Sequence, residues 1–222
     1  MADEFILLDF WVRSFATRVK IALAEKGVEY ESREEDRSNK SPLLLKMNPV
    51  HKQVPVLIHN GKPMWESLII VQYIDENFLN HFQQFPLLPC DPHQRAQARF
   101  WDDFVDKKIC SVSKLTWSST GEAQEAAKND LIGCLELLEG ELGDKPYFGG
   151  DTFGFVDVAL IPFFNFFCTI EQLSNFRIVA ECPKLVAWRH RCMEKESVSK
   201  SFPNHHKLYD FLLGSKKKLE AK

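Results

Sequence analysis

The stretch that decides the fold is VPVLIHNGKPMWESLIIVQYIDENF, residues 54–78. Two short apolar segments, 54–59 and 62–65, flank the pair Asn60-Gly61, which favours a two-residue type I′ turn. The residues that follow, 66–78, are apolar on nearly every face, which predicts a helix buried on both sides. The stretch therefore predicts an antiparallel hairpin that leads directly into a buried helix.

Upstream of the hairpin, strand and helix signals alternate. Residues 5–11 form a nearly continuous apolar run, as in a strand buried on both faces, and 15–23 carry an apolar helical face that ends at Gly27. In residues 28–34 apolar and polar positions alternate, as in a strand with one solvent-exposed face. Residues 41–49 have room for a short helix only. The order β-α-β-α-β-β-α predicts a mixed sheet with parallel crossovers first, an antiparallel hairpin last, and helices on its faces.

Downstream, the pattern changes. Residues 79–91 contain two prolines and little periodicity, which indicates a linker, and from Pro92 onward every periodic segment is helical. Aromatic and apolar residues stripe 100–105, and leucines recur at helical spacing over 131–142. We therefore divide the chain into an α/β domain (1–78), a linker (79–91) and an all-helical domain (92–222).

One helix of the second half has a recognisable start. Asp157 stands three residues after Gly154, at the N3 position of a strongly apolar helix. A carboxylate at N3 can accept a hydrogen bond from the backbone N–H at the cap, which is one half of a capping box. We expect Asp157 to have this folding role.

Composition narrows the functional classes. The formal net charge of −3 provides no basic field for nucleic acid or for an anionic membrane. The N-terminus carries acids where a signal peptide carries bases, and the apolar run 155–170 is short for a membrane span and contains Asp157 and Pro162. We expect a cytoplasmic protein that binds neither membrane nor nucleic acid.

The six cysteines all follow residue 89, without a C-x-x-C motif or a metal-like spacing to histidine. We expect free thiols in a reducing compartment and no metal site. The α/β domain, residues 1–78, contains no cysteine at all.

Several local sequences together resemble the plant tau class of the cytosolic glutathione transferases. They are LLDFW with RVKIALAEKG, NKSPLLLKMNPVHKQVPVLIHNGKPMWESLIIVQYIDE, PLLPCDPHQRAQARFW and GFVDVALIPF. The similarity covers essentially the whole chain. It implies a thioredoxin-like glutathione-binding domain before an all-α domain, a homodimer, and glutathione as co-substrate with no other cofactor and no metal.

The resemblance assigns the γ-glutamyl end of glutathione to Glu66 and Ser67. Ser67 would offer its hydroxyl and backbone N–H to the carboxylate, and Glu66 would interact with the γ-glutamyl group. The position is physically reasonable, since a helix N-terminus presents unpaired N–H groups and a partial positive charge. The alternative is that Ser67 only caps its helix.

The resemblance also assigns the rest of the tripeptide. The family keeps the proline at position 55 cis, so that the backbone of Val54 pairs with the cysteinyl backbone of glutathione. Lys40 corresponds to the lysine that meets the glycyl carboxylate. Gln53 stands where related sequences commonly carry lysine, which leaves one cationic contact to that carboxylate open.

The turn that would activate the thiol departs from the family pattern. That pattern runs Trp-Pro-Ser-x-Phe, and its serine donates to the glutathione sulfur, whereas this chain has Val12 and Arg13 in place of the proline and serine, with Ser14 one residue late. We expect Arg13 to stabilise the thiolate and Ser14 to assist. The alternative is that Arg13 faces solvent and Ser14 only caps the helix.

The same turn has no cysteine, so the mixed-disulfide chemistry of the omega, lambda and dehydroascorbate-reductase types is excluded by that route. The reacting sulfur must belong to glutathione.

The second substrate should lie between the two halves of the molecule. Its expected contacts are Phe10, Val12, Phe15, Cys110, Lys114, Trp117 and Phe211. Apolar and aromatic walls suit hydrophobic electrophiles. The expected activity is conjugation of glutathione to such electrophiles, with reduction of organic hydroperoxides beside it. The alternative is a glutathione-binding carrier of apolar ligands without turnover.

Overall fold

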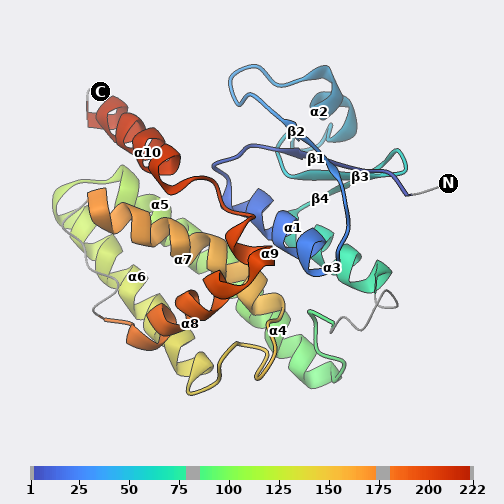
Figure 1. The fold of residues 1–222 in the computed structure, drawn as a ribbon. Coiled ribbons are helices and arrows are strands. Elements are labelled where there is room, and N and C mark those ends of the chain that lie inside the picture. Colours follow the sequence, from blue (N-terminus) through green and yellow to red (C-terminus); the bar gives the residue numbers. More distant parts are fainter. Residues whose placement is uncertain (1–2, 79–85, 174–180, 221–222) are drawn as a thin grey trace.

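The computed structural model describes residues 3–78, 86–173 and 181–220. In the first half the chain forms four strands and three helices in the predicted order (Figure 1). They are β1 (Phe5–Asp9), α1 (Ser14–Glu25), β2 (Glu31–Glu34), α2 (Pro42–Met47), β3 (Val56–His59), β4 (Lys62–Trp65) and α3 (Ser67–Asn77).

The four strands form one mixed sheet in the order β2-β1-β3-β4. Strands β1 and β2 are parallel, and β3 is antiparallel to both β1 and β4. The β3–β4 hairpin closes through Asn60 and Gly61, whose φ angles of 49° and 77° lie in the left-handed region that a type I′ turn requires. The predicted mixed sheet with a terminal hairpin is confirmed.

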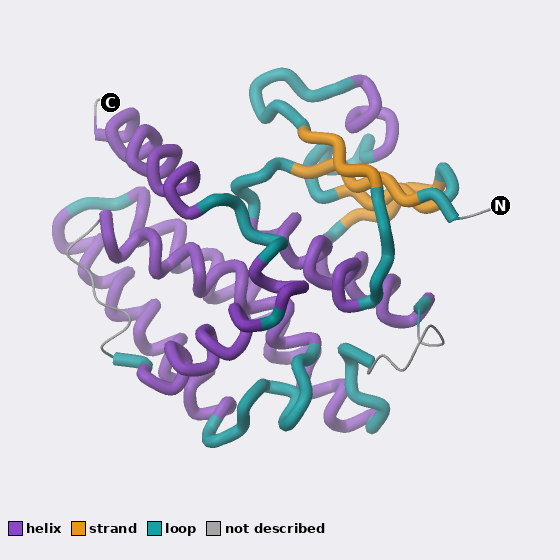
Figure 2. The backbone as a smooth tube through the Cα atoms, viewed as in Figure 1, coloured by secondary structure: helices purple, strands orange, loops and turns teal. Residues whose placement is uncertain are grey.

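Helices cover both faces of the sheet (Figure 2). On one face Leu7 and Leu57 pack with α1 and α3, and on the other Ile6 and Val56 pack with Leu44 of α2. Alternate residues of the central strands therefore serve two different apolar clusters, because successive strand side chains point to opposite faces. This explains the continuous apolar run of β1.

In the part of the second half that the structure describes, the regular elements are helices joined by turns and loops. Its elements are α4 (Pro92–Phe104), a π-helical segment η1 (Val105–Ile109), α5 (Cys110–Ser118), α6 (Gly121–Leu142), α7 (Phe155–Leu173), α8 (Pro183–Glu194), α9 (Glu196–Ser199) and α10 (His205–Glu220). Helix α7 packs against α1, α4, α8 and α10 and is the central helix of this half. Helix α3 ends at Asn77 and α4 begins at Pro92. The predicted linker falls largely on 79–85, outside the described residues.

Two expectations about exposure are wrong in detail for the single chain. Helix α3 is not buried on both sides, since Ile69 is 59% exposed. Phe100 in the aromatic stripe of α4 is also exposed. All four residues of β2 are exposed, because β2 is an edge strand paired only with β1. A single sequence shows that a position is apolar, but it does not show whether another element covers it.

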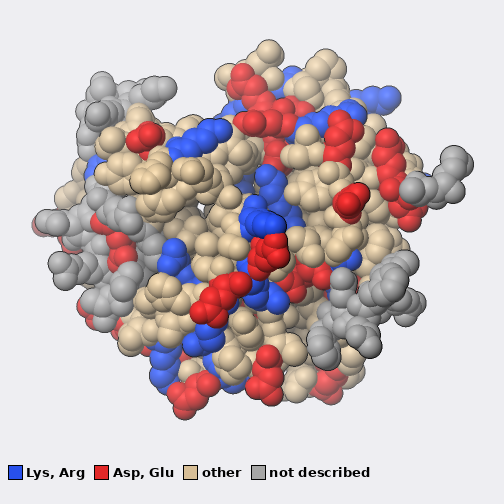
Figure 3. Space-filling model, in the orientation of Figure 1, with Lys and Arg blue, Asp and Glu red and all other residues tan. Residues whose placement is uncertain are grey.

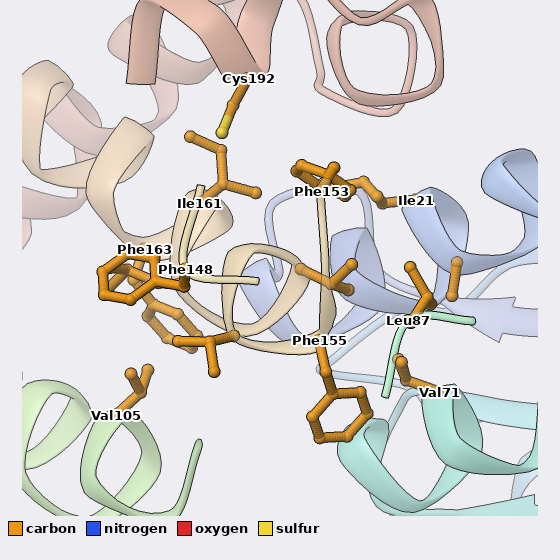
Figure 4. Close-up of a cluster of buried hydrophobic side chains, with 14 of the residues drawn as sticks. Ile21, Val71, Leu87, Val105, Phe148, Phe153, Phe155, Ile161, Phe163 and Cys192 are labelled. Carbon is orange, nitrogen blue, oxygen red and sulfur yellow. The ribbon is translucent and has the colours of Figure 1, made fainter. Parts of the chain in front are cut away.

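One apolar core runs through both halves (Figure 4). In this close-up, Ile21 of α1 lies beside Phe153, and Val71 of α3 lies near Leu87, which precedes α4, and near Phe155 at the start of α7. The leucines predicted to stripe the long helix, namely Leu131, Leu135, Leu138 and Leu142, are buried in the same cluster. The sheet domain and the helices are therefore held together by continuous packing.

The surface in the orientation of Figure 1 carries both signs of charge, interspersed among uncharged residues (Figure 3). Among the described helices, none is long and apolar enough to cross a membrane.

Candidate functional site

A pocket of about 140 Å³ lies where the loop before β3 meets the start of α3. Its lining residues are Phe15, Asn48, His51, Gln53, Val54, Pro55, Glu66 and Ser67. Five of these, from Gln53 to Ser67, are the residues that the resemblance assigned to glutathione, and Phe15 was assigned to the acceptor. Asn48 and His51 were not predicted.

The loop between α2 and β3 is fixed by Asn48, which is buried. Its side-chain amide donates to the carbonyl of Gln53 (3.0 Å), and its carbonyl oxygen accepts from the backbone N–H of His51 (3.0 Å). The Val54–Pro55 peptide bond that follows is cis, as the resemblance implied. The asparagine thus holds the wall of the pocket that carries Val54.

The opposite wall is the N-terminus of α3. Glu66 is the N-cap residue, and its φ of 65° is a backbone conformation that residues other than glycine seldom adopt. Such outliers persist where the surrounding structure enforces them, often at binding sites. Ser67 is the first helical residue, and the first N–H groups of a helix have no partner within the helix. This wall therefore suits an anion.

Ser67 accepts a hydrogen bond from a fully buried arginine, Arg18 of α1, at 3.1 Å. A serine hydroxyl has one hydrogen and two lone pairs, and a guanidinium in a protein stays protonated and can only donate. Because Arg18 occupies one lone pair of Ser67, the hydroxyl hydrogen is free to donate toward the pocket. The pair prepares Ser67 as a donor to a carboxylate.

Arg18 also connects the pocket to the helical half. Its Nε donates to the carbonyl of Ala159 on α7 (2.9 Å), and its Nη2 lies 2.7 Å from Oδ1 of Asp106. The guanidinium stacks near the rings of Phe15 and Phe163, with its Cζ 5.3 and 4.7 Å from the two ring centroids. A mid-helix arginine gives no sequence signal of burial, and sequence reasoning missed it.

At the turn before α1, Arg13 is the N-cap residue and its side chain makes no cap hydrogen bond. Arg13 is half-buried and has no ion pair with a described carboxylate. Burial lowers the pKa of Arg13, and the positive charge of Arg37 lowers it further. Two guanidinium groups thus lie close enough to repel each other, which favours an anion near them.

Ser14 is oriented differently. Its hydroxyl donates to the carbonyl of Pro162 on α7 at 3.4 Å, which is long for a hydrogen bond of this type. With Val12 it lines a small cavity of about 10 Å³ against α7 and α10. Neither Arg13 nor Ser14 lines the 140 Å³ pocket.

Lys40 is exposed in the loop before α2 and does not line the pocket either. That loop is held by the buried Glu35, whose carboxylate accepts from the backbone N–H (3.0 Å) and the hydroxyl (2.6 Å) of Ser41. Ser41 in turn caps α2. The backbone of Lys40 is therefore held in place through the next residue, Ser41.

The predicted acceptor residues fall into separate groups. Phe10 and Phe211 of α10 are in edge-to-face contact at 6.1 Å between ring centroids, and Val12 packs against Leu208 and Leu212. Phe15 contacts Phe163 in the same edge-to-face manner. These contacts bring the turn before α1 together with α7 and α10.

On α5, Lys114 is exposed, and the side chain of Trp117 lies outside the described residues. Burial raises the pKa of the Cys110 thiol to about 12, so Cys110 can provide an apolar surface but not a thiolate at neutral pH. Within the described parts of the chain, no group of three or more His, Cys, Asp or Glu side chains is placed to hold a metal ion.

Comparison with known families gives two matches. A family model for the glutathione S-transferase N-terminal domain matches residues 3–76, and one for the C-terminal domain matches residues 121–191. Among curated proteins, the chain is 57% identical to the probable glutathione S-transferase parA of Nicotiana tabacum and 56% identical to glutathione S-transferase U19 of Arabidopsis thaliana. Both alignments cover 98% of this chain and 98% of the relative.

Solved structures of glutathione transferases are similar to this chain as well. The rice glutathione transferase GST1, crystallised in complex with glutathione, superposes with a TM-score of 0.89 at 45% identity over 98% of each chain. The tau-class glutathione S-transferase of mango, Mangifera indica, superposes with a TM-score of 0.88 at 39% identity over 94% of this chain and 96% of the other.

Proposed function

Since this chain belongs to the glutathione S-transferase family, and within it to the plant tau class, we propose that it conjugates the thiolate of glutathione to hydrophobic electrophiles. The observation that carries the proposal is the pocket that gathers Val54, Pro55, Glu66 and Ser67 around one helix N-terminus. In the proposed complex Ser67 binds the γ-glutamyl carboxylate, Glu66 the ammonium group beside it, and Val54 the cysteinyl backbone. Lys40, in the loop before α2, binds the glycyl carboxylate. Gln53 is neutral, so it adds no second positive charge for that carboxylate.

Activation of the thiol is assigned to Arg13, with Ser14 assisting. A free thiol has a pKa of about 8.5, and lowering it by two units requires roughly 2.7 kcal/mol of preference for the thiolate. A hydrogen bond to a charged group contributes about 1.5–3 kcal/mol, so one guanidinium suffices. The unpaired, half-buried Arg13 supports this assignment, while the long bond from Ser14 to Pro162 leaves that hydroxyl a lesser role.

In the proposed complex the hydrophobic electrophile contacts Phe10, Val12, Phe15, Cys110, Lys114, Trp117 and Phe211. The same thiolate would reduce organic hydroperoxides. It attacks the terminal peroxide oxygen, the alcohol leaves with a proton, and the sulfenic acid of glutathione reacts with a second glutathione to give the disulfide and water. Holding two substrates in one cleft supplies much of the rate gain.

The deciding experiment is an ultraviolet titration of thiolate absorbance for glutathione bound to the full chain. We expect a midpoint about two units below that of the free thiol. Arg13→Ala should raise the midpoint by about one unit or more, and Ser14→Ala by less. An unshifted midpoint in the unmodified protein would instead favour the alternative, a glutathione-binding carrier without turnover. The similarity to named glutathione S-transferases argues against that alternative. If neither substitution moves the midpoint, both residue assignments are wrong.

We also propose a homodimer. Three large apolar side chains, Ile69, Phe100 and Leu137, are exposed on α3, α4 and α6. Light scattering of the purified chain should give twice its mass of 25.7 kDa, and Ile69→Lys should shift the equilibrium toward the monomer.

A further inference from the structure

The pocket contains a histidine to which the proposed function gives no role. The side chain of His51 is 57% exposed, and its Nε2 lies 3.8 Å from Oε1 of Glu66. Its backbone is fixed through the hydrogen bond to the buried Asn48. The imidazole therefore belongs to a loop whose backbone is held in place, and it lies near the carboxylate of Glu66 at the start of α3.

Without His51 the described lining of the pocket offers no positively charged side chain to the carboxylates of glutathione. Glutathione carries two carboxylates and one ammonium group. Among the described residues that line the pocket there is no lysine or arginine, and the ionisable side chains are His51 and Glu66. Lys52, next to His51 in sequence, is exposed and is not part of the lining. His51 is thus the lining side chain that can carry positive charge.

The contact with Glu66 indicates which carboxylate is involved. The ammonium and carboxylate of the γ-glutamyl end share one carbon atom, so the groups that bind them must be neighbours. Glu66 and His51 are such neighbours, and Ser67 follows Glu66 directly. An acidic, a basic and a hydroxyl side chain then match the ammonium group and carboxylate of this end.

Resting on the proposed function, we propose that His51 in its imidazolium form binds the γ-glutamyl α-carboxylate of glutathione, so that affinity for glutathione falls as His51 loses its proton. Histidine changes charge between about pH 5 and 8. The charged group that faces it from α3 is Glu66, and the nearest charged residues along its own segment are Lys46 and Lys52.

The experiment is isothermal titration calorimetry with S-methylglutathione, which has no thiol to ionise. For the full chain, Kd should rise about fivefold between pH 5.5 and pH 8, the size expected for one exposed charge pair. His51→Gln should bind weakly and equally at both values. His51→Lys should bind tightly at both. His190→Gln, an exposed histidine on α8, is the matched control and should behave like the unmodified protein.

Two further ligands test the choice of carboxylate. S-methyl-γ-glutamylcysteine lacks the glycine and should keep the pH dependence, whereas an S-methylglutathione without its α-carboxylate should lose it. Loss of the pH dependence with S-methyl-γ-glutamylcysteine would overturn the assignment to this carboxylate. The same pH dependence in His51→Gln and the unmodified protein would overturn the role of His51. Absence of any S-methylglutathione binding would instead contradict the proposed function.

Discussion

Asp102 of α4 is a buried carboxyl group that the proposed chemistry does not use. Both of its oxygens are buried and lack a hydrogen-bond partner among the described residues. Burial raises its pKa well above the usual value, the charge of Arg18 opposes this rise, and Asp106, four residues on, adds to it. A buried carboxyl without partners is more stable as the neutral acid.

This arrangement predicts a pH-dependent loss of stability. Below about pH 4 both the folded and unfolded chains hold the proton, and as pH rises the unfolded chain releases it first. Stability therefore falls, by about 1.4 kcal/mol per pH unit, until the pH reaches the raised pKa of the folded state. Asp102→Asn has no proton to release, so its free energy of unfolding relative to the unmodified protein should increase by more than about 1 kcal/mol from pH 4 to 7.

Urea denaturation at several pH values measures this difference. Asp103→Asn is the matched control, since Asp103 is its sequence neighbour but is exposed and paired with Lys107. It should show no such trend. Parallel stability curves for Asp102→Asn and the unmodified protein would mean that Asp102 is ionised in the folded state.

Of the residues that line the pocket, the sequence pointed to those within a recognisable motif and missed Asn48 and His51. Glu66 and Ser67 follow a hairpin directly, so their place at a helix start could be inferred. Arg18 and Asp102 look like ordinary surface charges of amphipathic helices. Their roles arise from what packs over them, and one sequence does not contain that information.

Among the elements, the start of α7 was predicted in outline. Asp157 accepts from the backbone N–H of Gly154 at 2.8 Å, which is the predicted half of a capping box. It also accepts from the backbone N–H of Phe148 (3.0 Å) and from the indole N–H of Trp188 on α8 (2.6 Å). The carboxylate thus joins a loop and two helices, contacts that lie too far apart in sequence to be predicted.

Asp157→Ala should therefore lower the free energy of unfolding by more than the loss of a helix cap alone would. It leaves three buried N–H donors without an acceptor, each at about 1–3 kcal/mol, so we expect at least about 3 kcal/mol of destabilisation. Asp151→Ala, at an exposed aspartate six residues earlier, should cost less than about 0.5 kcal/mol. Urea unfolding followed by circular dichroism compares the two. A loss below about 1 kcal/mol for Asp157→Ala would mean that water replaces the carboxylate.

Across the whole molecule, the boundary between the two halves is clear in sequence but not in packing. The change from mixed to purely helical periodicity predicts domains at 1–78 and 92–222, and this division stays a prediction. In the structure α1 and α3 share one apolar cluster with α7. Polar contacts cross the same boundary, since Arg18 of α1 forms an ion pair with Asp106 and donates to the carbonyl of Ala159. The glutathione pocket is thus supported from the helical half.

Substitution of Arg18 can separate the stability that this residue provides from its effect on binding. Arg18→Met keeps much of the volume but leaves Asp106, the Ser67 hydroxyl and the Ala159 carbonyl without their donor. Removing one partner of a buried pair costs about 3–5 kcal/mol, and partial exposure of Asp106 should place the loss near the lower limit. Arg33→Met, which breaks an exposed pair with Glu31, should change the free energy of unfolding far less, because water already solvates both charges.

The double variant Arg18→Met/Asp106→Leu then decides between the two roles. Replacing both charges by apolar groups should restore much of the stability, because no buried charge is left unpaired. It should not restore affinity for S-methylglutathione, since the Ser67 hydroxyl still lacks the donor that directs its hydrogen into the pocket. Calorimetry and urea denaturation on the same preparations measure both. Recovery of affinity together with stability would show that Arg18 acts on the pocket only by holding the two halves together.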